Sequence, residues 1–327
     1  MKIRRLILVT LAAKFLISLF AALVAFSSFV SWRAGQKEAL AEANYPPEGQ
    51  LLNVDGYQVH AVVMGKGPDV VLIHGASGNT RDMTFSLAPR LAKNYRVIVF
   101  DRPGLGYTDP ISDTGATIIQ QADLLESAAL QLGATKPIVV GHSYGGSVAL
   151  TWAVHHPDNI SALVLVAAAS NPWTTSMEPY YQIISSRLGS ALVVPLITAF
   201  ATESNIDDAM ADTFAPQPTS KGYGENVGAG LTLRRASTRA NALQRANLLD
   251  EIIALEPHYG EISVPTEIVH GTDDDTVNFE TNAVKVSRQI DGAVLTRLEG
   301  VGHMPHHVAE DQVIAAIDRA ATHAGLR

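Results

Sequence analysis

The sequence contains no cysteine among its 327 residues. This absence excludes disulfide bonds, thiolate metal sites, a cysteine nucleophile and a lipid-modified N-terminal cysteine. Charged residues make up only 17%, and their balance is negative, with a formal net charge of −8 at pH 7. Since no long basic run is present either, a nucleic-acid partner is not expected. Hydrophobic residues reach 47%, which is sufficient for a large core and argues against global disorder.

The run from residue 6 to residue 30 is almost free of charge. Residues 6–30 include one charged residue, Lys14, and would form a helix about 37 Å long, enough to cross a hydrocarbon core of about 30 Å. Three cations precede this run: Lys2, Arg4 and Arg5. This flank predicts a cytoplasmic N-terminus, so we expect residues 1–30 to be a signal anchor with the body periplasmic or extracellular. A cleaved signal peptide, which would release a secreted body, is the alternative.

Short β-branched runs alternate with segments of helix length from about residue 50 onward. The strand-like runs are residues 70–73, 97–100, 138–140, 163–166, 267–269 and 294–298. This alternation predicts a parallel sheet with helices on both faces. An antiparallel hairpin should precede it at residues 51–64, where Asp55-Gly56 separates two runs. The alternation stops between about residues 171 and 264, where apolar residues recur at helical spacing.

A serine lies at the centre of residues 141–145, whose sequence is Gly-His-Ser-Tyr-Gly. A strand-like run precedes this pentapeptide and a helix-like run follows it. Strand, G-x-S-x-G and helix, in that order, are typical of a sharp turn that exposes the serine hydroxyl. The two glycines leave room for strand and helix to approach each other. The pattern therefore predicts Ser143 as a nucleophile.

A serine nucleophile needs a base that takes its proton and a third group that orients the base. His303 lies in a glycine-rich segment just after the last predicted strand, and it is the candidate general base. Three consecutive aspartates follow the penultimate predicted strand, and one of them should accept the imidazole N–H. Spacing from Gly271 and Val277 favours Asp274, and Asp273 is its rival.

The tetrahedral intermediate needs N–H donors for its oxyanion. One donor should be the backbone of Tyr144, at the start of the helix that follows the nucleophile. The other should come from the loop after residues 70–73, where Ala76 is the candidate.

Metal chemistry is the competing interpretation of the histidines near the C-terminus. His306 and His307 suggest a ligand pair, but Pro305 argues against the helix that such a pair needs. No third ligand is evident nearby. Neither a metal nor a cofactor is therefore expected.

Together these motifs resemble those of the α/β-hydrolase superfamily over residues 50–325. The matching motifs are His74-Gly75 as the HG oxyanion motif, residues 101–106 as the D-x-x-G-x-G loop, residues 141–145 as the nucleophile elbow, residues 271–277 as the acid loop and Gly302-His303 as the histidine loop. The chain order serine, aspartate, histidine is also typical of the superfamily.

The resemblance implies an α/β fold with a mostly parallel eight-stranded sheet, helices on both faces and a helical lid inserted after the sixth strand. The lid would occupy about residues 171–264 of one hydrolase domain at residues 49–327. Residues 31–48, which are polar and rich in alanine, would link this domain to the signal anchor.

The implied activity is a serine hydrolase that cleaves an acyl bond, foremost a carboxylic ester, through an acyl-enzyme. The substrate would be a small apolar acyl compound, and the N-terminal helix would contact a membrane. An acyltransferase, a C–C bond hydrolase and a cofactor-free haloperoxidase on the same scaffold are alternatives. A non-catalytic binding module is the alternative from another class. Serine rather than aspartate at residue 143 argues against epoxide opening and dehalogenation.

Overall fold

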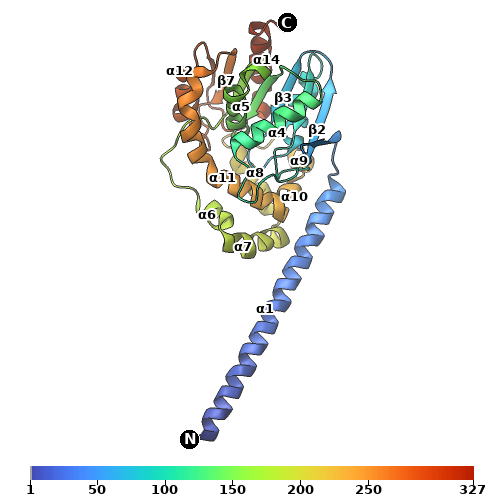
Figure 1. The fold of residues 1–327 in the computed structure, drawn as a ribbon, viewed down its shortest axis with the longest axis vertical. Coiled ribbons are helices and arrows are strands. Elements are labelled where there is room, and N and C mark those ends of the chain that lie inside the picture. Colours follow the sequence, from blue (N-terminus) through green and yellow to red (C-terminus); the bar gives the residue numbers. More distant parts are fainter. Residues whose placement is uncertain (1) are drawn as a thin grey trace.

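An eight-stranded sheet forms the centre of the body, in the order β1-β2-β4-β3-β5-β6-β7-β8 (Figure 1). The computed structural model describes the backbone of residues 2–327 and the side chains of residues 10–327. β1 pairs with β2 and β2 with β4 in antiparallel register, and the remaining pairs are parallel. The strands are β1 (Gln50–Val54), β2 (Tyr57–Gly65), β3 (Asp69–Ile73), β4 (Arg96–Phe100), β5 (Ile138–His142), β6 (Ala162–Val166), β7 (Thr266–Gly271) and β8 (Val294–Leu298).

Helices cover both faces of the sheet and connect its strands. Those outside the β6–β7 connection are α1 (Lys2–Asn44), α2 (Thr80–Thr84), α3 (Leu87–Leu91), α4 (Ile118–Gln131), α5 (Tyr144–His155), α12 (Lys285–Gln289), α13 (Pro305–Val308) and α14 (Glu310–His323), with a 3₁₀-helix η1 (Pro157–Asn159) and a π-helix η3 (Glu280–Val284). The apolar side chains of α4 and α5 pack on one face, and those of α3 and α14 pack on the other. The strands between them are buried on both sides, which explains their continuous rather than alternating apolar runs.

The regular secondary structure between β6 and β7 is all helical. They are α6 (Pro179–Ser185), α7 (Arg187–Phe200), α8 (Glu203–Phe214), α9 (Tyr223–Val227), α10 (Ala229–Thr232), α11 (Arg235–Leu255) and η2 (Glu256–Glu261). We call residues 171–264 the cap. It lies over the edge of the sheet at which β5 and β7 end.

The long helix α1 projects from the body as a single rod (Figure 1). Residues 31–44, which the sequence analysis places in a linker, continue this helix. Alanine is the best helix former, and the helix ends just before Pro46-Pro47, where proline disfavours helical backbone in the preceding residue. Among the described residues, Thr10–Asn44 is the one unbroken helix long and apolar enough to cross a membrane. The side chains of the cationic flank, Lys2, Arg4 and Arg5, lie outside the described residues.

Candidate active site

Ser143 lies on the turn between β5 and α5 in a strained backbone conformation. Its φ of 52° and ψ of −120° are rare for a residue with a side chain. The flanking glycines allow the turn, because a Cβ on Gly141 would lie 2.2 Å from the carbonyl oxygen of Gly145. A Cβ on Gly145 would lie 2.3 Å from the carbonyl oxygen of Ile73. The strain and the close packing together hold the serine side chain above the end of β5.

The structure brings Ser143, His303 and Asp274 together in one buried row. Nδ1 of His303 lies 2.8 Å from Oδ2 of Asp274, and its Nε2 lies 2.9 Å from Oγ of Ser143. An ionised carboxylate only accepts hydrogen bonds, so Nδ1 carries the proton and Nε2 is left to accept from the Ser143 hydroxyl. The arrangement joins a hydroxyl, a base and an orienting carboxylate, as nucleophilic catalysis requires.

Asp274 is held in its ionised form. Burial would raise its pKa, but hydrogen bonds from His270 and His303 outweigh burial and place the pKa well below its usual value. The backbone N–H groups of Thr276 and Val277 donate to its other oxygen at 3.0 and 2.8 Å. Its rival Asp273 is exposed and accepts from the Thr272 hydroxyl instead.

The two residues expected to supply oxyanion donors face the same cavity as Ser143. Tyr144 is the first residue of α5, and Ala76 lies in the loop between β3 and α2. This loop approaches the nucleophile closely, since a Cβ on Gly75 would lie 3.1 Å from Cβ of Ser143. The N-terminus of a helix favours negative charge at this position.

Arg102 holds the loop between β3 and α2 through hydrogen bonds to its backbone. The side chain is fully buried and donates to the carbonyl oxygens of His74 and Gly75, both at 3.1 Å. Its guanidinium lies 4.1 Å from the ring centroid of Tyr144 and also donates to Gln244 of the cap at 2.9 Å. Burial lowers the pKa of Arg102 to about 10, so the group keeps its charge at neutral pH. Sequence reasoning missed this residue, whose only signal was its place in the D-x-x-G-x-G loop.

Asp82 of α2 and two histidines of α13 form a second buried cluster beside the first. Nε2 of His307 lies 2.9 Å from Oδ1 of Asp82, and Nε2 of His306 lies 3.3 Å from Oδ2. The argument that Pro305 excludes a helix here is wrong, because proline occupies the first turn of α13, where its missing N–H costs nothing. A third ligand-type side chain is also present. Asp82 lies more than 220 residues before the histidines, and no sequence spacing could have indicated it.

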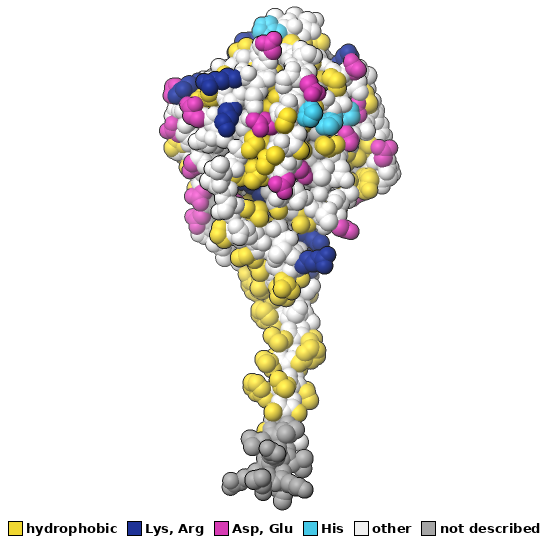
Figure 2. Space-filling model, turned by 60° about the vertical axis from the view of Figure 1, so that its left-hand side comes forward, with side chains coloured by type: hydrophobic (Ala, Val, Ile, Leu, Met, Phe, Trp, Pro, Cys, Tyr) yellow, Lys and Arg dark blue, Asp and Glu magenta, His cyan; other side chains and the backbone are white. Residues whose placement is uncertain are grey.

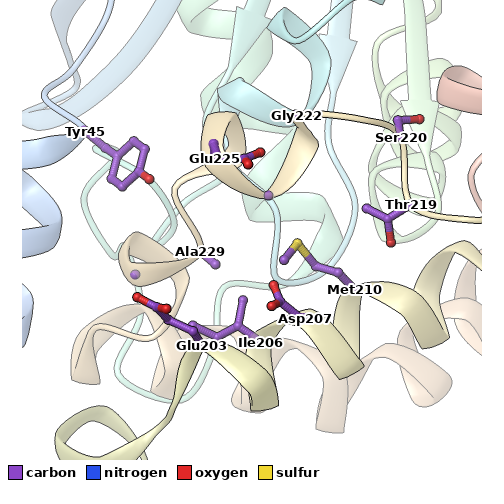
Figure 3. A pocket seen from close by; sticks show the side chains of 12 residues that line it. Tyr45, Glu203, Ile206, Asp207, Met210, Thr219, Ser220, Gly222, Glu225 and Ala229 are labelled. Carbon is purple, nitrogen blue, oxygen red and sulfur yellow. The ribbon is translucent and has the colours of Figure 1, made fainter.

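A cavity of about 600 Å³ opens in front of Ser143. Its walls come from the loop between β3 and α2, His303 and the inner faces of cap helices, including Tyr181, Ile184 and Ile197. A second cavity of about 570 Å³ lies between the end of α1 and the cap, and its wall includes Tyr45, Glu203 and Asp207 (Figure 3). The two cavities share Ile206, Met210 and Ala229 as lining residues, so they are neighbours within the cap.

A model of the alpha/beta hydrolase family matches residues 70–316. An uncharacterized protein of Mycobacterium tuberculosis is 27% identical over 297 residues, which cover 84% of this chain and 81% of that protein. The 2-hydroxymuconate semialdehyde hydrolase of a Pseudomonas species is 26% identical over 247 residues, or 74% of this chain and 83% of that protein.

Solved structures agree with this match. An alpha/beta hydrolase fold protein from Burkholderia ambifaria superimposes with a TM-score of 0.70 and 25% identity, covering 83% of this chain and 97% of that one. A thermophilic esterase from Thermogutta terrifontis gives a TM-score of 0.68 at 21% identity, covering 84% and 99%. The predicted fold class, including the mostly parallel eight-stranded sheet, is confirmed.

Proposed function

This chain belongs to the α/β-hydrolase family, and from that premise we propose that it is a serine hydrolase acting on carboxylic esters. The observation that supports the proposal is the row formed by Asp274, His303 and Ser143, with separations of 2.8 and 2.9 Å, in the wall of a largely apolar cavity.

In the proposed reaction, Oγ of Ser143 attacks the carbonyl carbon of the ester while its proton passes to Nε2 of His303. The carbonyl oxygen becomes negative and accepts hydrogen bonds from the backbone N–H groups of Ala76 and Tyr144. The imidazolium, oriented by Asp274, then protonates the leaving alcohol, and an acyl-enzyme remains. A water molecule attacks this ester by the same steps in reverse, which releases the acid and frees the serine.

Cleavage of a C–C bond is the second candidate, and two observations favour it. One is the similarity to 2-hydroxymuconate semialdehyde hydrolase. The other is Arg245, a cation in the cavity wall whose ion pair with Glu178 is long, at 3.6 Å. An arginine in this place could bind a carboxylate group of the substrate.

The apolar helix α1 supports a membrane anchor. Its large hydrophobic side chains between residues 11 and 29 are exposed, and similar side chains adjoin it at the near end of the body (Figure 2). The same helix is fixed to the cap, because Nε of Arg33 donates to the carbonyl oxygen of Ala199 at 2.8 Å and Arg235 pairs with Glu38 at 2.7 Å. If α1 is inserted in a membrane, the cap therefore faces the surface of that membrane.

Helices α6 and α7 favour an apolar substrate that arrives from that surface. Their outer side chains Ile183, Leu188 and Leu192 are exposed, and their inner side chains Ile184 and Ile197 line the cavity. Replacing both outer leucines, Leu188→Glu with Leu192→Glu, should lower hydrolysis of a vesicle-embedded ester about tenfold and leave a soluble short-chain ester unaffected. The matched control is Ile119→Glu on α4, which is also exposed. Equal effects of the two changes would contradict an entry from the membrane.

The first experiment is fluorophosphonate labelling of the full chain in detergent, followed by a panel of esters and 2-hydroxymuconate semialdehyde. Rapid labelling that Ser143→Ala and His303→Ala abolish, with ester turnover, would agree with the proposal. Turnover of the semialdehyde alone would favour the second candidate. A folded chain that neither labels nor turns over any compound would favour a non-catalytic module.

The absence of cysteine permits a direct test of topology. Asp113→Cys would add a single thiol at an exposed position of the body. If the body lies outside the cytoplasmic membrane, a membrane-impermeant maleimide should label this thiol in intact cells. Labelling only after permeabilisation would place the body in the cytoplasm.

A further inference from the structure

The cluster of Asp82, His306 and His307 has no part in the proposed hydrolysis, although Asp82 lines the same cavity as Ser143. All three side chains are nearly or fully buried. One ligand-type atom from each lies within 4.8 Å of the other two, so a nitrogen, a nitrogen and an oxygen converge on one point. Within residues 10–327, no other three such side chains bring one ligand-type atom each within 4.8 Å of the other two.

The spacing of these atoms fits a small divalent ion. Bonds of about 2.0–2.1 Å to zinc separate tetrahedral ligand atoms by about 3.3 Å. The carboxylate lies 3.3 Å from Nε2 of His306 and 2.9 Å from Nε2 of His307. The first separation is long for a hydrogen bond, and both carboxylate–imidazole separations need to change by no more than a few tenths of an ångström to hold an ion. The two imidazole nitrogens lie within 4.8 Å of each other and would approach to about 3.3 Å.

The surroundings of the carboxylate and of His307 are those of a shielded ligand site. The hydroxyl of Tyr223 donates to Oδ1 of Asp82 at 2.8 Å, which orients the carboxylate as an outer hydrogen bond orients a metal ligand. Rings of Phe85 and Phe214 flank His307 at 5.9 and 5.5 Å between centroids, so the site is shielded from bulk water. Asp82 faces the cavity, which provides an entry path and a place for a water as fourth ligand.

We propose that Asp82, His306 and His307 bind one zinc-class divalent ion in the wall of the cavity. The ion would take the place of the proton that each Nε2 now directs at the carboxylate, and that proton would move to Nδ1 of the same ring, which has no hydrogen-bond partner in the described structure. Because α13 begins two residues after His303, an ion here would also fix the loop that holds this histidine. The proposal concerns binding alone and stands independently of the hydrolysis.

The test is a titration of the full, metal-free chain, in detergent and without a histidine tag, with Co²⁺ followed by visible absorption. Since the chain has no cysteine, tetrahedral d–d bands would report imidazole and carboxylate ligands alone. We expect about one equivalent to bind, Zn²⁺ to displace it, and Tm to rise by roughly 5 °C at a hundredfold excess over Kd.

Four variants separate the proposal from its rivals. Asp82→Asn and His307→Gln should weaken binding at least about a hundredfold, and His258→Gln, at an exposed histidine of the cap, should not affect it. His303→Gln should keep the bands, which excludes an ion held by the catalytic histidine. Bands lost with His303→Gln but kept with His307→Gln, or a folded wild type with no bands, would overturn the proposal. The cluster would then be a hydrogen-bonded support for α13.

Discussion

The sheet and the cap bury their apolar side chains to different degrees, and this difference suits the two regions to different roles. The side chains of β5 and β6 are almost wholly buried, and the helices that cover them contribute continuous apolar cores. In the cap, by contrast, α7 leaves Leu188 and Leu192 with exposed fractions of 75% and 64%. Dense packing holds a geometry to a fraction of an ångström, and looser packing allows a wall to change with its contents. The proposed reacting groups lie on the first region, and the second would enclose the substrate.

The two regions meet at the loop between β3 and α2, which carries the proposed oxyanion donor Ala76. Asn241 of α11 accepts from the backbone N–H of Ser77 at 2.8 Å and donates to its hydroxyl at 2.9 Å. Thr232 of α10 donates to the carbonyl oxygen of Ser77 at 2.7 Å. Ser77 itself has a φ of 55°, which is strained and needs such support. The cap therefore closes the cavity and also holds one wall of the reaction centre.

The largest effect should come from the carboxylate that orients His303. Asp274→Asn would place an amide where Nδ1–H needs an acceptor, so the wrong tautomer would face Ser143. We expect kcat to fall about 10⁴-fold on a soluble ester. Asp273→Asn is the matched control and should change kcat less than about twofold, because that side chain is exposed. A large loss in Asp273→Asn with little in Asp274→Asn would reverse the assignment.

Replacing a glycine by alanine, once next to the sheet and once in the cap, should show how tightly each region is packed. Gly145→Ala would press a methyl group against the backbone of β3, 2.3 Å from the Ile73 carbonyl oxygen, and should lower the free energy of unfolding by about 3 kcal/mol. Gly224→Ala in the cap would meet only the end of Met210 at 3.2 Å and should have little effect. Urea unfolding measures both. Equal losses would mean that the sheet and the cap are packed alike.

Sequence reasoning was most successful where local chemistry dictates structure. Short apolar runs that alternate with helix-length segments predicted the sheet, because parallel strands are buried on both faces and are joined by helices. The glycine positions predicted the turn at Ser143. Asp274 could be favoured over Asp273 only by spacing, whereas the structure distinguishes them by burial. Contacts between distant segments left no local pattern, as the pairing of Asp82 with His307 shows. The helical state of residues 31–44 was missed because it depends on docking against the cap as well as on composition.

Acid should destabilise the sheet region through the buried His74, and the exposed histidine of the cap should contribute little. Burial, with the nearby Arg102 charge, lowers the pKa of His74 to about 4, so the folded chain keeps this imidazole neutral. An unfolded histidine takes up a proton near pH 6.5, hence the unfolded state binds more protons between pH 6.5 and 4 and stability falls as pH falls. The loss from pH 7 to pH 5 should be about 2 kcal/mol from His74.

Urea unfolding of the full chain at the two pH values measures this loss. His74→Gln should reduce the difference by about 2 kcal/mol, because glutamine does not titrate. His258→Gln, at an exposed histidine of the cap, should leave the difference unchanged. If His74→Gln retains the full pH dependence, the buried imidazole is not its source.

The smallest predicted effect tests whether the cap contributes to the reaction centre. Asn241→Ala would remove both hydrogen bonds to Ser77, and the adjacent Ala76 N–H would lose part of its fixed orientation. Since misplacing one oxyanion donor costs less than deleting it, kcat should fall about tenfold with KM nearly unchanged. Asn247→Ala on the same helix, which removes only a bond to the Thr114 carbonyl oxygen, is the control. A rise in KM at constant kcat would instead mean that the cap serves substrate binding alone, because only interactions stronger in the transition state alter kcat.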